Sequence, residues 1–326
     1  MEIKEVIGEI TIATYCENVA ILKKVVEEQA VIRSISKHCN SNGTLDIDGN
    51  LKIWGNVMSR FKKIKLWENT PGFDDRDSRQ SEPFMVFVPA LNITNRKGTI
   101  VTAHGGGFEL RTGCEGVHTA KYFNDAGFDV AILSYRIKPY CRMDSFADMQ
   151  RAIRMLRARK EELGIADKIF VMGFSAGGML SANCATHFDD GNNGSIDIVE
   201  QQSSRPDAAV IGYGAMSAVS FPVPFGMEIE WNNWGRTKEE RLFLAPEKNI
   251  SSKTPPFFIW QTLSDDGRYG MCLAKALQDA GIPYELHIFQ QGVHGLAMAD
   301  GANDLGLNIP HVAHWGQLCK EWLEQI

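Results

Sequence analysis

The stretch Ile169-Phe-Val-Met-Gly-Phe-Ser-Ala-Gly-Gly178 decides the fold. Its first four residues are apolar and predict a buried strand, and the small residues that follow predict a helix through Ala185. Between them lies the pattern G-x-S-x-G, in which a serine occupies a sharp, strained turn from strand to helix. Side chains at Gly173 and Gly177 would collide with neighbouring elements, so both positions require glycine. The helix N-terminus places the amide of Ala176 where negative charge can develop.

Short apolar runs alternate with amphipathic stretches from about residue 84 to the end of the chain. Buried, β-branched runs separated by helices are typical of a parallel sheet that helices cover on both faces. The sequence therefore predicts an α/β fold with a mostly parallel central sheet. The expected strands are 85–88, 99–103, 129–133, 168–172, 208–211, 256–261 and 284–289, and the expected helices besides the one after the serine are 115–126, 148–163, 270–280 and 311–325.

A second glycine-rich turn, His-Gly-Gly-Gly at 104–107, follows the expected strand 99–103 and begins 71 residues before Ser175. Consecutive glycines let backbone N–H groups face a tetrahedral oxyanion without obstruction, which is typical of one half of an oxyanion hole. A flexible loop or a phosphate-binding turn is the alternative, but no Walker lysine follows and the spacing is not G-x-G-x-x-G. We expect the ring of His104 to hold the turn in place rather than to act as a base.

A hydrolytic serine needs a histidine as base and a carboxylate that orients it. With a G-x-S-x-G turn the chain order is serine, acid, histidine, each after a strand. Asp265 and Asp266 follow the expected strand 256–261, and His294 follows 284–289, at strand ends where parallel sheets build their sites. Either aspartate could serve. The other histidines are placed less well, because they precede the serine, follow it too closely, or lie inside a strand or on the last helix: His38, His118, His187, His287, His311 and His314.

Composition and charge exclude several classes of protein. The 326 residues are 44% hydrophobic and 23% charged, which argues against disorder and coiled-coil rods. The formal net charge of −6 argues against binding to nucleic acid or to an anionic membrane, because both attract an excess of positive charge. No apolar run is long enough to span a bilayer, and the first residues lack a secretory pattern. Seven scattered cysteines without a C-x-x-C pair predict free thiols, no zinc site and a cytoplasmic location.

Three segments lie outside the alternating pattern. Residues 1–60 predict a short strand and an amphipathic helix, packed either on the main domain, 61–326, or at the interface of a homodimer. The irregular stretches 186–206 and 213–253 are long enough to form a small lid or binding loops. Aromatic side chains of the second stretch either line an acyl or sugar pocket or cover an edge of the core: Phe221, Phe225, Trp231 and Trp234.

Taken together, these motifs resemble the α/β-hydrolase superfamily, and within it the hormone-sensitive-lipase-like and acetylxylan-esterase-like carbohydrate esterases. The resemblance runs from about Ile64 to the C-terminus and is specific in motif order and spacing. It implies the α/β-hydrolase fold and a serine esterase that removes short acyl groups, typically acetate, from sugars or small esters. The segments that carry it are 104–108, 115–116, 135–140, 173–178, 254–256, 260–265 and 293–296.

The resemblance also implies roles for individual residues. Ser175 would be the nucleophile, His294 the general base and then the acid, and Asp265 the orienting carboxylate, because it occupies the family's place after Trp-x-Thr-x-x. Three backbone amides would form the oxyanion hole, those of Gly106, Gly107 and Ala176.

The chain departs from the family pattern at two places. Gln261 stands where histidine is common, and 266–269 stands where a Val-Pro-like step usually follows the acid. The second departure lies next to Asp265 and would reshape the acid loop. Residues 135–139 are expected to be structural, with Arg136 tying down a turn.

The predicted function is a serine carboxylesterase that acts on a small-molecule ester by two-step acyl transfer, without a metal or organic cofactor. A serine peptidase of the same fold is one alternative, although the residues before the first core strand are too few for a propeller domain. A longer-chain lipase is a second, and it would need a more apolar lid than 213–253 offers. A binding protein without catalytic activity is the third.

Overall fold

The computed structural model describes residues 61–74, 80–91, 94–108, 112–215, 217, 219–220, 235, 237–301, 303 and 307–326. The expected N-terminal strand and helix in 1–60 lie outside the described residues. So do the four aromatic side chains Phe221, Phe225, Trp231 and Trp234.

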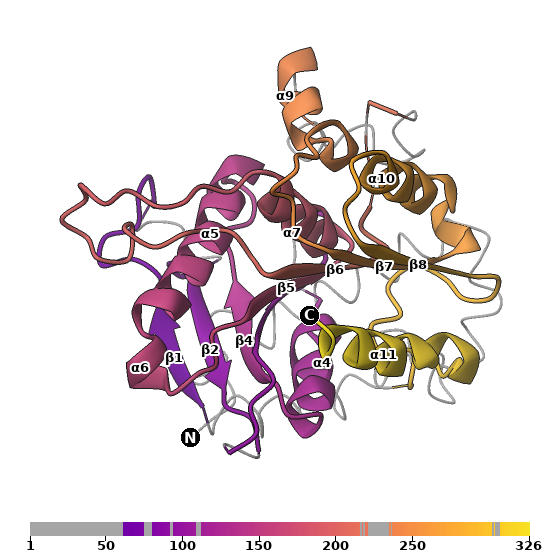
Figure 1. Ribbon diagram of the computed structural model, residues 1–326, viewed down its shortest axis with the longest axis horizontal. Helices are drawn as coiled ribbons and strands as arrows, with labels where there is room; N and C mark the ends of the chain where they lie inside the picture. The colour runs from indigo at the N-terminus through magenta and orange to yellow at the C-terminus, as the bar shows by residue number, and fades with distance from the viewer. Residues whose placement is uncertain are drawn as a thin grey trace.

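The described residues form one eight-stranded sheet with the order β1-β2-β4-β3-β5-β6-β7-β8 (Figure 1). The strands from β3 to β8 run parallel, as expected, whereas β2 is antiparallel to both β1 and β4. The strand bounds are Lys62–Lys65 (β1), Phe84–Val88 (β2), Thr99–Ala103 (β3), Asp129–Ser134 (β4), Ile169–Phe174 (β5), Ala208–Gly212 (β6), Phe257–Thr262 (β7) and Tyr284–Phe289 (β8).

Helices cover both faces of this sheet. The helix bounds are Cys114–Asp125 (α4), Arg142–Ala158 (α5), Lys160–Leu163 (α6), Ala176–Thr186 (α7), Lys238–Leu244 (α9), Arg268–Asp279 (α10) and Pro310–Leu323 (α11), with 3-10 turns at Pro246–Lys248 (η3) and Leu263–Asp265 (η4). Figure 1 shows α4 and α11 on one face and α5, α7 and α10 on the other. Alternate strand side chains enter the two cores: Val86 and Val88 face α4 and α11, while Met85 and Phe87 face the other layer.

Helix α5 begins at Arg142, six residues before the start expected from the apolar pattern. The first turn, residues 142–145, is mostly polar, so the apolar pattern does not mark it, although Phe146 after it is buried. Its start is set by a reciprocal cap, in which the N–H of Cys141 donates to the carboxylate of Asp144 at 2.9 Å. The helix ends at Ala158, and a separate turn, α6, completes the stretch expected to be one helix.

A buried ion pair ties the chain after β4 to α5. The guanidinium of Arg136 donates to Asp148 at 2.8 and 2.9 Å, and the backbone N–H of Arg136 donates to the same carboxylate at 2.8 Å. The two side chains are 2% and 0% exposed. The Trp67 indole adds a further hydrogen bond to Asp148 at 3.1 Å. The expectation that Arg136 fixes a turn is confirmed.

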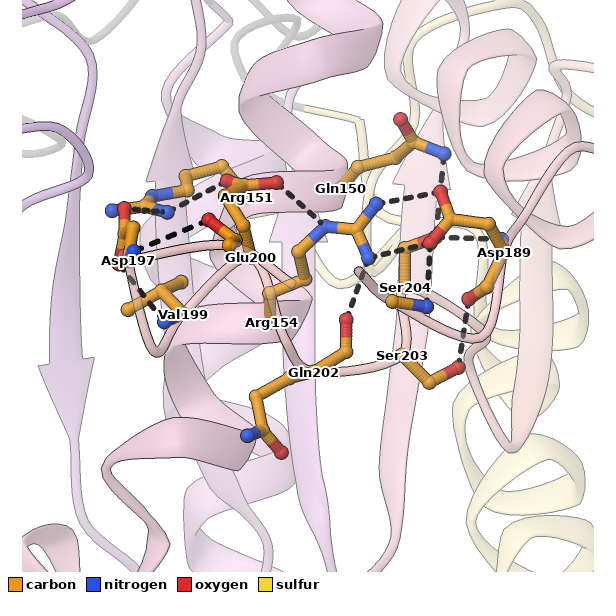
Figure 2. A network of polar contacts seen from close by, with 12 residues as sticks. Gln150, Arg151, Arg154, Asp189, Asp197, Val199, Glu200, Gln202, Ser203 and Ser204 are labelled. Carbon is orange, nitrogen blue, oxygen red and sulfur yellow. Dashed lines mark hydrogen bonds and ion pairs between the residues drawn. The ribbon is translucent and has the colours of Figure 1, made fainter. Parts of the chain in front are cut away.

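Arginine side chains of α5 form ion pairs with the irregular segment 186–206, which follows α7 (Figure 2). Arg151 pairs with Asp197 and Glu200 at 2.6 Å, and Arg154 pairs with Asp189 at 2.6 Å. The segment joins the end of α7 to the start of β6, so it lies toward the amino edge of the parallel strands. Residues 186–206 therefore do not cover the carboxyl edge, where the predicted site residues lie.

The turn between β5 and α7 is packed so closely that it excludes side chains. A Cβ on Gly173 would lie 2.0 Å from the carbonyl oxygen of Gly177, and one on Gly177 would lie 2.2 Å from the carbonyl oxygen of Ala103. Backbone atoms at such distances cannot move aside cheaply. The sequence expectation that both positions require glycine is confirmed.

Replacing Asp148 with alanine should lower the free energy of unfolding by about 3–5 kcal/mol, because it leaves Arg136 as an uncompensated buried charge. Urea unfolding of the purified proteins measures the change. The matched control is Lys275→Ala, which removes an exposed ion pair on α10 and should change stability by less than about 0.5 kcal/mol. Equal effects of the two substitutions would contradict the structural role of the buried pair.

Replacing Gly177 with alanine should destabilise the protein by about 3 kcal/mol or more, because its Cβ meets the backbone of β3. Soluble yield and thermal unfolding report the loss. Gly194→Ala is the control, since its Cβ would come no closer than 3.4 Å to another atom, and it should change stability by no more than about 0.5 kcal/mol. A Gly177→Ala protein as stable as the parent would show that the close approach is not real.

Candidate active site

Ser175 occupies the turn at the carboxyl end of β5. Its backbone has φ 51° and ψ −120°, a region that non-glycine residues seldom adopt and that costs about 1–3 kcal/mol. Two hydrogen bonds hold it there: its N–H donates to the carbonyl of Gly212 at 3.0 Å, and its carbonyl accepts from Met179 in α7 at 3.0 Å. The conformation directs the side chain out of the sheet at the start of α7.

His294 lies in the loop after β8 and joins two of the predicted site residues. Its Nε2 is 2.8 Å from the Oγ of Ser175, and its Nδ1 is 2.6 Å from Oδ1 of Asp265. The loop reaches this position through Gly292, which has φ 115° and whose absent Cβ would lie 2.7 Å from Thr262. Three residues far apart in the sequence thus form one continuous chain of hydrogen bonds.

The structure distinguishes the two candidate aspartates. Asp265 ends the turn η4, faces His294 and also accepts from the Thr262 hydroxyl at 3.3 Å. Asp266 turns away with φ 57°, and its carboxylate accepts from the Nε of Arg268 at 2.8 Å. That contact lowers the pKa of Asp266. The departure at 266–269 therefore gives the second aspartate a partner of its own and leaves Asp265 next to His294.

The electrostatic surroundings of His294 favour its protonated form. Burial disfavours the charged ring, but the Asp265 carboxylate, through its charge and its hydrogen bond, and the more distant Glu115 outweigh this, so the pKa of His294 is raised above 6.5. A ring that gains a proton from the serine is thereby stabilised.

The turn 104–107 lies directly beside the serine. Gly106 and Gly107 have φ of 113° and 63°, which only glycine adopts without strain. The amide of Gly105 is directed into the protein, toward the carboxylate of Glu115. His104 stacks on Tyr135 with 4.4 Å between ring centroids, and the Tyr135 hydroxyl donates to the carbonyl of His104 at 2.7 Å. These contacts support a structural role for His104.

Sequence reasoning missed two residues that contact this site. Tyr213 follows β6, and its ring centroid lies 4.9 Å from that of His294. Its hydroxyl donates to Glu115 at 2.6 Å and accepts from the N–H of Ala297 at 2.9 Å. Its place directly after a parallel strand was the signal that could have indicated Tyr213. Glu115 lies in the segment 115–116 that carries the family resemblance, but the sequence assigned it no role, because it reads as an ordinary acidic residue in the first turn of a helix.

A cavity of about 650 Å³ opens between the start of α5 and helix α9. Neither Ser175 nor His294 is among its lining residues, which are Cys141, Arg142, Met143, Gly235, Glu239, Glu240, Phe243 and Leu244. One of these residues, Arg142, has its guanidinium carbon 5.3 Å from the ring centroid of Phe108, which directly follows the glycine turn 104–107. The cavity is therefore separate from the serine and histidine pair.

Within the described ranges, no three histidine, cysteine, aspartate or glutamate side chains gather in a way that could hold a metal ion. Among the same residues, no helix has the length and apolar character needed to cross a membrane.

Comparison with known proteins places this arrangement in a family. Residues 86–268 match the BD-FAE family model. A solved acetyl ester-xyloside bifunctional hydrolase from Caldicellulosiruptor lactoaceticus is 34% identical, with a TM-score of 0.72 over 81% of this chain and 96% of that one. Endo-1,4-beta-xylanase B of Butyrivibrio fibrisolvens is 28% identical over 66% of this chain, and the matched part spans only 35% of that protein.

A more distant structure shows the fold alone. A carboxylesterase from Lactobacillus plantarum is 20% identical, with a TM-score of 0.60 over 74% of this chain and 92% of that one. The expectation of the α/β-hydrolase fold is confirmed. The chain belongs to the BD-FAE family, and it has the α/β-hydrolase fold of its solved ester-hydrolase relatives.

Proposed function

We propose that this protein is a serine carboxylesterase that hydrolyses short-chain acyl esters, above all acetyl esters, of a sugar or another small molecule. The observation that carries the proposal is the hydrogen-bonded chain from Ser175 Oγ through His294 to Asp265, with distances of 2.8 and 2.6 Å. A nucleophile, a base and an orienting carboxylate in this order are what acyl transfer requires.

In the first half of the reaction, the Oγ of Ser175 attacks the ester carbonyl carbon while Nε2 of His294 takes the hydroxyl proton. The new C–O bond places the negative charge on the former carbonyl oxygen. His294 then gives the proton to the leaving alcohol as the C–O ester bond breaks, and an acyl-serine remains. Asp265 keeps the proton on Nδ1 and stabilises the imidazolium that forms.

In the second half, water takes the place of the alcohol. His294 removes a proton from water, the hydroxide attacks the acyl-serine, and the proton passes to Ser175 Oγ as the acid leaves. In both halves, we assign the stabilisation of the oxyanion to three backbone amides: Ala176 at the start of α7, and Gly106 and Gly107 in the glycine turn. Such donors stabilise negative charge as it develops, which is why they accelerate the reaction.

The relatives support a carbohydrate ester as substrate. One is described as an acetyl ester-xyloside hydrolase, and another is a xylanase in which the matched segment is a minor part of the whole. We infer that the alcohol released is a sugar hydroxyl. The cytoplasmic location and the homodimer remain predictions, as does the role of 1–60.

Hydrolysis of p-nitrophenyl esters from acetate to dodecanoate tests the acyl preference. We expect the rate to fall steeply with acyl chain length. Ser175→Ala should lose at least about 10³-fold in kcat, and the remaining activity would come from the oxyanion hole. A preference for long chains would favour a lipase, and hydrolysis of aminoacyl amides but not esters a peptidase. No turnover of any ester, with Ser175 unlabelled by an organophosphonate, would favour a binding protein.

The pH profile tests the base and its acid. His294 must be neutral to accept a proton, and its pKa is raised, so kcat/KM should fall as the pH drops through a value above 6.5. Asp265→Asn should lower kcat about 10²- to 10⁴-fold and move this acidic limb to lower pH, because the charge that favours the imidazolium is gone. Asp266→Asn is the matched control and should leave kcat within about 3-fold. The reverse ranking would identify Asp266 as the acid.

A further inference from the structure

Glu115 is a buried carboxylate that the reaction steps above do not use. It lies in the first turn of α4 and is 1% exposed. Its Oε2 accepts from the backbone N–H of Gly105 and from the hydroxyl of Thr112, and its Oε1 accepts from the hydroxyl of Tyr213 at 2.6 Å. All three donors are neutral. Three such hydrogen bonds at a position without solvent indicate a built site for a carboxylate rather than a chance contact.

The carboxylate lies next to both halves of the catalytic apparatus. On one side, a Cβ placed on Gly105 would be 2.8 Å from Oε2 of Glu115 and 2.8 Å from the Cβ of Ser175, so both groups pack against that glycine. On the other side, the Tyr213 hydroxyl that donates to Glu115 accepts from the N–H of Ala297 at 2.9 Å. Ala297 belongs to the loop that carries His294. Glu115 therefore connects the glycine turn 104–107 with the histidine loop.

We propose that Glu115 is a positioning residue of the active site. It fixes the glycine turn 104–107 and the loop that carries His294 relative to each other, and its charge favours the imidazolium of His294. This inference rests on the proposed esterase function, because it assigns Glu115 to the same acyl transfer.

The charges that face His294 come from two elements. Asp265, after β7, contacts the ring directly, Glu115 on α4 acts through space, and the Tyr213 hydroxyl after β6 lies between Glu115 and the loop. Burial raises the pKa of Glu115, while its three hydrogen bonds and the charge of His294 oppose this. By the same coupling, Glu115 raises the pKa of His294. Removing the charge of Glu115 should therefore lower the pKa of His294.

The test is Glu115→Gln, which keeps the shape of the side chain but removes its charge and replaces one acceptor oxygen with an NH2 group that cannot accept. A ¹⁵N-histidine NMR titration without substrate, with the His294 signal identified from a His294→Gln sample, should show a lower pKa for His294 than in the parent. With p-nitrophenyl acetate, kcat should fall about 10- to 100-fold while KM stays within about 3-fold.

Two further variants separate charge from structure. Glu115→Asp retains the charge and should keep the pKa of His294 at the parent value, with part of kcat restored. Glu161→Gln removes an exposed carboxylate of α6 and should change neither quantity. If Glu115→Gln lowers thermal stability and kcat but leaves the pKa of His294 unchanged, Glu115 is merely structural and the proposal is wrong.

If Glu115→Gln does not fold, Tyr213→Phe tests the connection by removing one hydroxyl. We expect kcat to fall about 10-fold at constant KM, because Ala297 and Glu115 lose their shared partner. An unchanged kcat would overturn the proposal. The NMR titration keeps the two proposals apart: a lowered pKa in a protein that hydrolyses no ester would support the coupling of Glu115 to His294 and contradict the esterase function.

Discussion

The close approach of two backbones, at the start of α7 and the end of β3, is the constraint on which the site depends. Gly177 lies so near the carbonyl of Ala103 that no side chain fits between them. This contact places the serine turn beside the glycine turn 104–107, so that the proposed nucleophile and the proposed backbone donors lie in neighbouring turns. The cost is a strained backbone at Ser175, which the hydrogen bonds to Gly212 and Met179 hold in place.

Two carboxylates arrange the groups around that point. Asp265 contacts His294 directly, and Glu115 reaches the same loop through Tyr213. Neither carboxylate needs to move during the proposed reaction, and a site whose dipoles and charges are already oriented avoids the reorganisation that water would require. The buried carboxylate of Asp148 lies away from the site and stabilises the fold, because its ion pair with Arg136 joins the chain after β4 to α5. Similar chemistry thus serves both stability and the site.

Local pattern predicted the sheet well because buried parallel strands are short apolar runs. The strands 99–103 and 284–289 have the expected bounds, and the other five expected strands differ by one or two residues. The edge strand β1, Lys62–Lys65, was not predicted, because its alternation of three lysines with one isoleucine is not an apolar run. The antiparallel pairing of β2 was not predicted, since direction depends on partners that a local pattern does not contain. The start of α5 was missed because a polar first turn, capped by Asp144, carries no apolar periodicity. Ionic contacts with Arg151 and Arg154 of α5 decided where 186–206 lies, and these contacts join residues 35 and 49 positions apart.

Sequence pattern was enough to predict the alternating strands and helices from β2 to α7, the glycine-dependent turn at Ser175 and the two loops that carry Asp265 and His294, because each of these is local. It did not predict β1 or α9. Local pattern could not show which aspartate faces the histidine, since Asp265 and Asp266 are neighbours and the choice depends on Arg268 and on the path of the loop after β7. The tertiary structure also decided the place of Glu115. A buried carboxylate is stable only where donors converge on it. Thr112 is only three residues away from Glu115, but the Tyr213 hydroxyl is 98 positions away and reaches the carboxylate only when the sheet has formed.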